Sequence, residues 1–156
     1  MSGLFQYDAG NLVVAVMTTA SNGAWPEVCA KRTPDGKKPC VLIVDDDEMV
    51  LALMCRVLER AGCDVYACSN AADALDRLEM RTFDAVLLDV RMPGISGLEL
   101  FSIIQERWPE LAERTGFVTG NVPADEMRVL MRQFNRPFLL KPFGYDDLEH
   151  FARDLM

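Results

Sequence analysis

Two short apolar runs, residues 41–44 and 85–88, each end directly in aspartate, and this arrangement limits the possible folds of the chain more than any other feature. Neither run alternates between apolar and polar residues, as a strand does when one of its faces meets water. Uninterrupted apolar strands are typical of parallel sheets, which helices cover on both faces. The carboxyl ends of such strands lie at one edge of the sheet, where ligands bind. We therefore expect Asp45, Asp46 and Asp89 to lie close together.

From residue 39 onward, strand patterns alternate with helix patterns. Gly62 ends the first predicted helix, and Asn70 can cap the second. Ser96 and Glu99 form a capping box at the start of the third. The predicted strands are residues 40–44, 64–67, 84–88, 116–119 and 137–140. Five strand–helix units predict a three-layer α/β fold with a doubly wound, five-stranded parallel sheet and five helices.

Residues 1–38 differ in composition, because they are rich in Gly, Ser, Thr, Asn and Pro and end in a turn-rich stretch. We interpret them as a linker-like N-terminal extension, either disordered or with one short strand at residues 12–16. Residues 39–156 would form the folded domain, with no output domain after it. No apolar run approaches the ~18 residues that span a bilayer. The N-terminus also lacks the basic segment of a secretory signal, so we expect a soluble, cytoplasmic protein.

Net charge and cysteine spacing argue against two classes of function. The formal net charge of −8 opposes binding to nucleic acid phosphates, so we expect no direct nucleic acid partner. The five cysteines show no CxxC spacing, and the single histidine, His150, lies far along the chain. Clustered zinc ligands are therefore missing from the sequence, and we expect idle thiols. The cysteines are Cys29, Cys40, Cys55, Cys63 and Cys68.

Two further polar residues end predicted strands: Thr119 ends the fourth strand, and Lys141 ends the fifth. Three carboxylates at one edge repel one another unless a hard cation bridges them, and Mg²⁺ prefers oxygen ligands. A hydroxyl and an ammonium group bind oxyanions. Taken singly, each residue has a plainer explanation as a helix cap, a turn residue or a solvated side chain. Taken together, they predict a magnesium-dependent site that serves phosphate chemistry.

Four motifs occur in order at these strand ends. They are Val-Asp-Asp-Asp-Glu, Leu-Leu-Asp-Val-Arg-Met-Pro-Gly, Val-Thr-Gly and Leu-Lys-Pro-Phe. With these motifs, residues 39–156 resemble the receiver domain of two-component response regulators, which has a flavodoxin-like, chemotaxis-regulator-like fold. Residues 136–143 further resemble receivers of hybrid sensor kinases. The chain is then either a stand-alone regulator or a receiver cut from a longer protein.

The resemblance implies a chemical role for each matched residue. Asp89 would be the phosphoacceptor, forming a 4-aspartylphosphate with a phosphoryl group from a sensor histidine kinase or a histidine phosphotransfer protein. Asp46, Asp89 and the backbone carbonyl of Arg91 would ligate Mg²⁺, and Asp45 would assist through water. Lys141 would pair with a phosphoryl oxygen. Such a receiver is not an enzyme that turns over a substrate, although it assists its own phosphoryl transfer and dephosphorylation.

The resemblance also implies how the signal is read. Thr119 would hydrogen-bond the attached phosphoryl group and couple to Phe138, which is equally interpretable as a static core residue. The Lys141–Pro142 bond would be cis. Arg91 and Asn121 flank the pocket and could tune hydrolysis of the acyl phosphate, or Arg91 could instead form a salt bridge.

A downstream partner protein would respond to phosphorylation, and a homodimer could form through the face of the fourth helix, fifth strand and fifth helix. The main alternative is a receiver-like interaction module that works without phosphorylation. A phosphohydrolase with an aspartyl-phosphate intermediate would need a second aspartate two residues after the nucleophile. Arg91 occupies that position, which argues against such an enzyme.

Overall fold

The computed structural model describes residues 36–120 and 122–156. The strand predicted at residues 12–16, Cys29 and the site residue Asn121 therefore lie outside the described residues. Among the residues that are described, no helix has both the length and the apolar character needed to cross a membrane.

Strands and helices alternate along the chain, as the sequence predicts. In order, they are β1 (Cys40–Val44), α1 (Glu48–Arg60), β2 (Asp64–Cys68), α2 (Ala71–Met80), β3 (Ala85–Asp89), α3 (Gly97–Arg107), α4 (Pro109–Ala112), β4 (Thr115–Thr119), α5 (Ala124–Phe134), β5 (Phe138–Leu140) and α6 (Tyr145–Leu155). The strands form one sheet in the order β2-β1-β3-β4-β5, and every neighbouring pair is parallel. The predicted doubly wound, five-stranded sheet is therefore confirmed.

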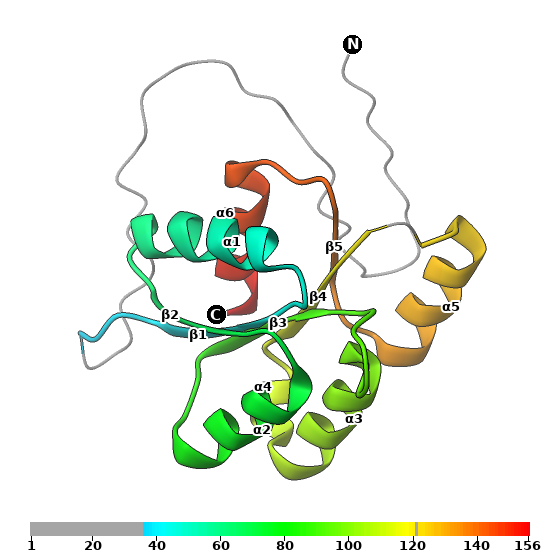
Figure 1. Cartoon of the computed structure of the whole chain (residues 1–156), viewed down its shortest axis with the longest axis horizontal. Helices are drawn as coiled ribbons and strands as arrows, with labels where there is room; N and C mark the ends of the chain where they lie inside the picture. Colours follow the sequence, from blue (N-terminus) through cyan, green and yellow to red (C-terminus); the bar gives the residue numbers. More distant parts are fainter. Residues whose placement is uncertain (1–35, 121) are drawn as a thin grey trace.

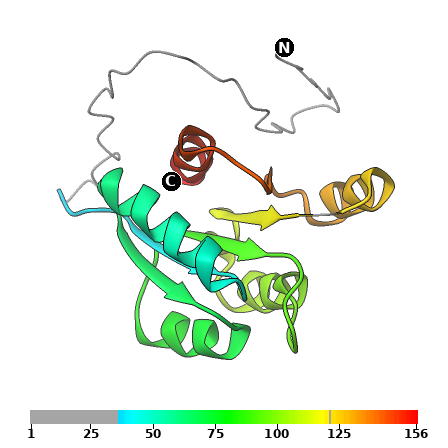
Figure 2. The same cartoon turned by 45° about the horizontal axis from the view of Figure 1, so that its top comes forward.

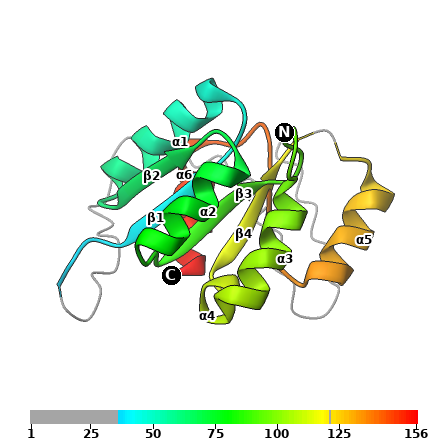
Figure 3. The same ribbon diagram turned by 60° about the horizontal axis from the view of Figure 1, so that its bottom comes forward.

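Helices cover both faces of the sheet and make three layers. Helices α1 and α6 lie on one face, and α2, α3 and α4 lie on the other (Figure 1). Helix α5 stands beside the β4–β5 side of the sheet, as the turned view in Figure 2 shows. Figure 3 looks onto the face that α2 and α3 cover. Residues 41–44 are at most 1% exposed, and all of β3 is buried, which explains why these two central strands carry no polar alternation.

The predicted helix caps form as expected. Asn70 accepts a hydrogen bond from the backbone N–H of Asp73 at the start of α2. Ser96 and Glu99 make the reciprocal capping box of α3. These contacts satisfy backbone N–H groups that have no partner inside the helix. They fix where the helices begin relative to the strands before them.

The sequence prediction of five helices misses one, because the described chain also contains the short helix α4. It begins at Pro109, whose fixed backbone angle suits the first helical position and whose missing N–H costs nothing there. Its four residues are too few to show helical periodicity, and this explains why the sequence pattern does not reveal it.

Candidate functional site

Three carboxylates converge at the carboxyl edge of the sheet. Strands β1 and β3 are neighbours with Val44 opposite Leu88, so Asp45 and Asp89 follow side by side. Each of Asp45, Asp46 and Asp89 offers one oxygen within 4.8 Å of the others. Asp45 and Asp89 are buried, whereas Asp46 is exposed to solvent. The convergence that the sequence predicts for these three side chains is confirmed.

Burial and repulsion act together on Asp89. Burial, and next the nearby charge of Asp45, raise the pKa of this carboxyl group from 3.8 to about 6. The positive charge of Lys141 lowers the pKa of Asp89 but does not cancel these effects. A hydrogen bond with Asp46 and the charge of Asp46 also favour the protonated form. A cation among the three carboxylates would relieve this repulsion.

Lys141 brings a positive charge to the same cluster. Its Nζ donates a hydrogen bond to Asp45 Oδ2 at 2.5 Å and lies 3.8 Å from Asp89 Oδ1. Its backbone N–H donates to the carbonyl oxygen of Thr119 at 2.7 Å, which ties the end of β5 to the end of β4. The Lys141–Pro142 peptide bond is cis, as the resemblance implies.

Thr119 places a buried hydroxyl at the same edge of the sheet as these charges. The residue is 1% exposed, and its Oγ1 is buried with no hydrogen-bond partner among the described residues. It lies at the end of β4, which pairs with β3 so that Val118 is opposite Asp89. A buried hydroxyl without a partner costs about 1–3 kcal/mol. The group is therefore available as a donor to an anion held at Asp89.

Comparison with known proteins decides the family of a chain with this site. Residues 41–153 match the family described as the response regulator receiver domain. The chain belongs to this family. It is a receiver domain of two-component signal transduction, a signalling module and not a classical enzyme. Receiver domains partner with histidine kinases or histidine phosphotransfer proteins.

Two relatives of this receiver are larger proteins of different kinds. It is 32% identical over 111 residues to the transcription factor SKN7 of Saccharomyces cerevisiae, covering 69% of this chain and 17% of SKN7. It is 33% identical over 120 residues to the sensor histidine kinase GacS of Pseudomonas protegens, covering 73% of this chain and 13% of GacS. The receiver thus spans less than a fifth of either relative.

A solved structure supports the fold. The response regulator TrrA from Thermotoga maritima superimposes with a TM-score of 0.64 at 24% identity, over 76% of this chain and 99% of that chain. The likeness extends over nearly all of TrrA, so the whole receiver fold is shared.

Phe138 lies in the core of the receiver and not at its surface. It is 2% exposed and stacks on Phe117, with ring centroids 4.9 Å apart. Phe117 also meets Phe101 of α3 and Phe134 of α5 edge to face. This packing agrees with the core interpretation of Phe138, and its switching role stays a prediction.

Arg91 forms a salt bridge, one of the two alternatives that the sequence left open. Its Nη2 donates to both carboxylate oxygens of Glu126, each at 3.0 Å. Sequence reasoning missed Glu126, because it lies 35 residues further along the chain and no local pattern marks it. The backbone carbonyl of Arg91 as a magnesium ligand stays a prediction.

Gly97 is a second residue that sequence reasoning missed as part of the site. A Cβ on Gly97 would lie 1.8 Å from the carbonyl oxygen of Asp89, so no side chain fits there. The backbone N–H of Gly97 donates to the carbonyl oxygen of Val90 at 3.1 Å. The start of α3 therefore packs directly against the backbone of Asp89 and Val90, where β3 ends. A glycine inside a capping box is the only signal that the sequence offers for this contact.

The four described cysteines and the histidine take no part in the acidic cluster. Burial raises the pKa of the Cys63 thiol to about 11 and raises those of the other described thiols, Cys40, Cys55 and Cys68. Thiols that stay protonated are poor metal ligands and nucleophiles. His150 is exposed on α6, where its Nδ1 lies 2.7 Å from the carbonyl oxygen of Asp146. These features agree with idle thiols and a surface histidine.

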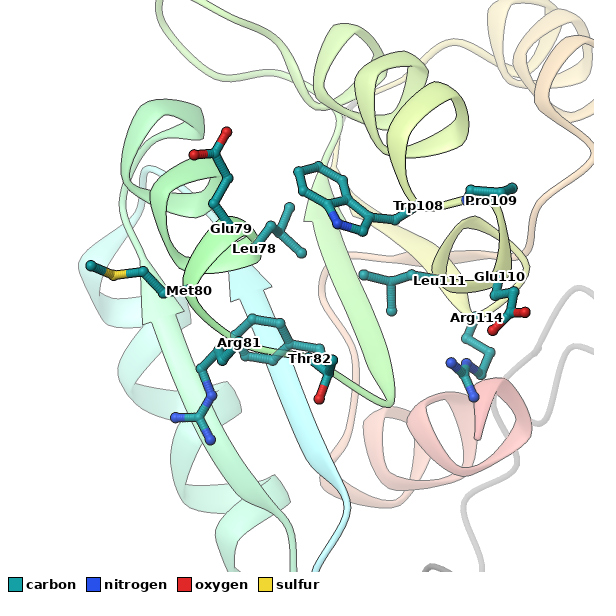
Figure 4. A pocket seen from close by; sticks show the side chains of 11 residues that line it. Leu78, Glu79, Met80, Arg81, Thr82, Trp108, Pro109, Glu110, Leu111 and Arg114 are labelled. Carbon is teal, nitrogen blue, oxygen red and sulfur yellow. The ribbon is translucent and has the colours of Figure 1, made fainter.

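A cavity of about 600 Å³ lies away from the carboxylates (Figure 4). It is lined by the end of α2, the segment before β3 and residues 108–111, with Arg114 at the start of β4. Because these segments precede β3 and β4, the cavity lies at the amino ends of the strands. Asp89 lies at their carboxyl ends, so the cavity and the candidate site occupy opposite edges of the sheet.

Proposed function

We propose that this receiver is a phosphoacceptor. A carboxylate oxygen of Asp89 would attack the phosphorus of a phosphohistidine on a sensor histidine kinase or a histidine phosphotransfer protein. The phosphorus–nitrogen bond would break, and its electron pair would return to the imidazole. The observation that carries the proposal is the position of Asp89, a buried carboxylate 3.8 Å from the Lys141 ammonium and within an acidic cluster.

The acidic cluster fits magnesium by the chemistry of its donors. Mg²⁺ takes oxygen ligands at about 2.0–2.1 Å, so two ligand oxygens on one ion lie at most about 4.2 Å apart. The three carboxylate oxygens already lie within 4.8 Å of one another, so small side-chain adjustments suffice. Asp46, Asp89 and the backbone carbonyl of Arg91 would hold the ion, and Asp45 would assist through water. When bound, it would neutralise charge on the phosphoryl oxygens.

Lys141 and Thr119 would hold the transferred group. The Lys141 ammonium is already beside Asp89, where it would pair with a phosphoryl oxygen as negative charge accumulates. The Thr119 hydroxyl, unpaired and buried, would donate to another phosphoryl oxygen. TrrA was solved in complex with Mg²⁺ and beryllofluoride, which supports the same use of the shared fold here.

The signal would be read by a downstream partner protein on the surface formed by α5, β5 and α6. Each of these elements has an exposed apolar side chain: Val129 is 60% exposed, Leu140 is 48% exposed and Tyr145 is 52% exposed. Exposed apolar groups on these three elements support a protein partner, or a second copy of the chain in a homodimer. Phe138 beneath this surface would move with Thr119 when the phosphoryl group is attached. Residues 1–38 would be an extension outside this receiver.

Beryllofluoride, a phosphoryl mimic, tests whether the pocket is competent. Nuclear magnetic resonance titration with beryllofluoride should shift signals from the ends of β3, β4 and β5 only when Mg²⁺ is present. Asp89→Asn should abolish the response. Asp47→Ser removes a nearby charge while keeping a residue that can cap α1, and it should respond like the parent. No response in the parent would favour an interaction module that works without phosphate.

A further inference from the structure

We propose that Glu126 holds the Arg91 guanidinium away from the acceptor pocket, and that a phosphoryl group on Asp89 competes with Glu126 for it. Glu126 would thus be a positioning residue that sets the lifetime of the phosphorylated state. The inference rests on the proposed function, because it requires that Asp89 be phosphorylated.

Arg91 sits where its side chain can serve either partner. It lies in the loop directly after β3, two residues beyond Asp89. Two residues span at most about 7 Å of chain, a distance that an arginine side chain matches. Both carboxylate oxygens of Glu126 accept from the Nη2 of Arg91 at 3.0 Å. The guanidinium of Arg91 therefore binds α5 and not the pocket.

The salt bridge between Arg91 and Glu126 is weak enough for Arg91 to exchange Glu126 for a phosphoryl group. The side chains of Arg91 and Glu126 are 55% and 46% exposed, and exposed ion pairs stabilise little because water screens them. A phosphoryl group adds about two negative charges and three strong acceptor oxygens at neutral pH. Guanidinium binds phosphate oxygens through two parallel hydrogen bonds, so the new group is the stronger partner.

The exchange would have two consequences. A guanidinium over the phosphoryl group would cover the open side of the pocket and slow attack by water. Helix α5 would lose its salt bridge with the loop after β3 and would be held by the packing of its apolar side chains on the core, where Leu130 is its one buried residue among those described. The lifetime of the phosphoryl group and the mobility of α5 would therefore respond to the same pair of side chains.

The lifetime of the Asp89 adduct tests the exchange. Glu126→Gln should lengthen the half-life several-fold, because it frees Arg91, and Arg91→Ala should shorten it several-fold. The double variant should behave like Arg91→Ala. Asp125→Asn removes a neighbouring negative charge from the same first turn of α5 and should leave the half-life unchanged. The proposal is overturned if Asp125→Asn matches Glu126→Gln, or if Glu126→Gln still lengthens the half-life without Arg91.

Hydrogen exchange of α5 amides gives a second readout that needs no phosphoryl donor and no Mg²⁺. In the phosphate-free protein, Glu126→Gln and Arg91→Ala should each speed exchange in the first turn of α5 by the same factor, and the double variant should add nothing. Unequal or additive effects would contradict a shared contact. If the parent forms no adduct, the proposed function fails and this inference fails with it. If the parent is phosphorylated and Glu126→Gln has no effect, only this inference fails.

Discussion

The raised pKa of Asp89 reflects the two main features of the site, its burial and its crowded negative charge. A carboxyl group with a pKa of about 6 is one that the fold destabilises as an anion, chiefly by burial and next by the charge of Asp45. A site that is proposed to take a divalent cation and a phosphoryl group would have this character before either arrives, because the charges that repel one another would be the ligands.

The raised pKa of Asp89 predicts that the stability of the protein depends on pH. The folded pKa of Asp89 exceeds its ordinary value of 3.8, so the folded state binds more protons, and the free energy of unfolding falls as pH rises from about 4 to about 6. Asp89→Asn should remove this loss. After discounting for screening by water at the open pocket, we expect the variant to be more stable by about 1–2 kcal/mol at pH 7.5.

Urea denaturation in a metal chelator at pH 4 and pH 7.5 would measure the difference. The advantage of Asp89→Asn should be small at pH 4, where the carboxyl group is mostly protonated in the folded state. A variant that is less stable than the parent at pH 7.5 would show that Lys141 compensates the burial fully.

Because the Thr119 hydroxyl has no described partner, we expect its removal to weaken beryllofluoride binding without lowering the stability of the protein. Thr119→Val replaces a buried hydroxyl without a described partner by a methyl group, so stability should be unchanged or rise by about 1 kcal/mol. Affinity for beryllofluoride with Mg²⁺ should fall about tenfold, equivalent to about 1.4 kcal/mol. Calorimetric titration and urea denaturation would measure the two quantities.

Thr115 supplies a matched control on the same strand. It is fully buried, and its Oγ1 donates to the carbonyl oxygen of Leu111 at 2.9 Å. Thr115→Val should therefore destabilise the protein by about 1–2 kcal/mol and leave beryllofluoride affinity unchanged. A Thr119→Val variant that loses as much stability would mean that the Thr119 hydroxyl has a partner in the phosphate-free protein.

At the scale of elements, the contact of α3 with the end of β3 predicts a strict requirement for glycine at residue 97. Gly97→Ala would place Cβ 1.8 Å from the Asp89 carbonyl oxygen, and backbone cannot yield cheaply there. We expect a loss of stability of about 3 kcal/mol or more, as in severe overpacking, measured by urea denaturation. Gly94 has a positive φ of 77° but open space around it, so Gly94→Ala should cost only about 1 kcal/mol. Equal losses for both variants would contradict the packing argument.

The sequence predicts well those strands and helices whose apolar pattern matches their burial or whose ends carry capping residues. β1 and β3 are buried on both faces and read as uninterrupted apolar runs, and α2 and α3 carry their own caps. The prediction fails at α4, which is one turn long, and each strand boundary that differs does so by one residue. Short elements have too few residues for a period to appear.

At the scale of the whole molecule, parallel topology is what made the candidate site predictable. Strand ends that are far apart in sequence meet at one edge, so Asp45 and Lys141 contact each other across 96 residues. The side-chain pairing itself, and the bridge from Arg91 to Glu126, could not be predicted, because they depend on the orientation of α5 and β5. The two edges of the sheet also differ, with the acidic site at one and the cavity at the other.

The covalent adduct tests the central claim most directly. Intact-mass analysis after incubation with acetyl phosphate should show one phosphoryl adduct, which requires Mg²⁺ and is lost in Asp89→Asn. Asp47→Ser should form the same adduct as the parent. An adduct that persists in Asp89→Asn would place the acceptor elsewhere, and a parent that neither forms an adduct nor binds beryllofluoride would contradict the phosphoacceptor account.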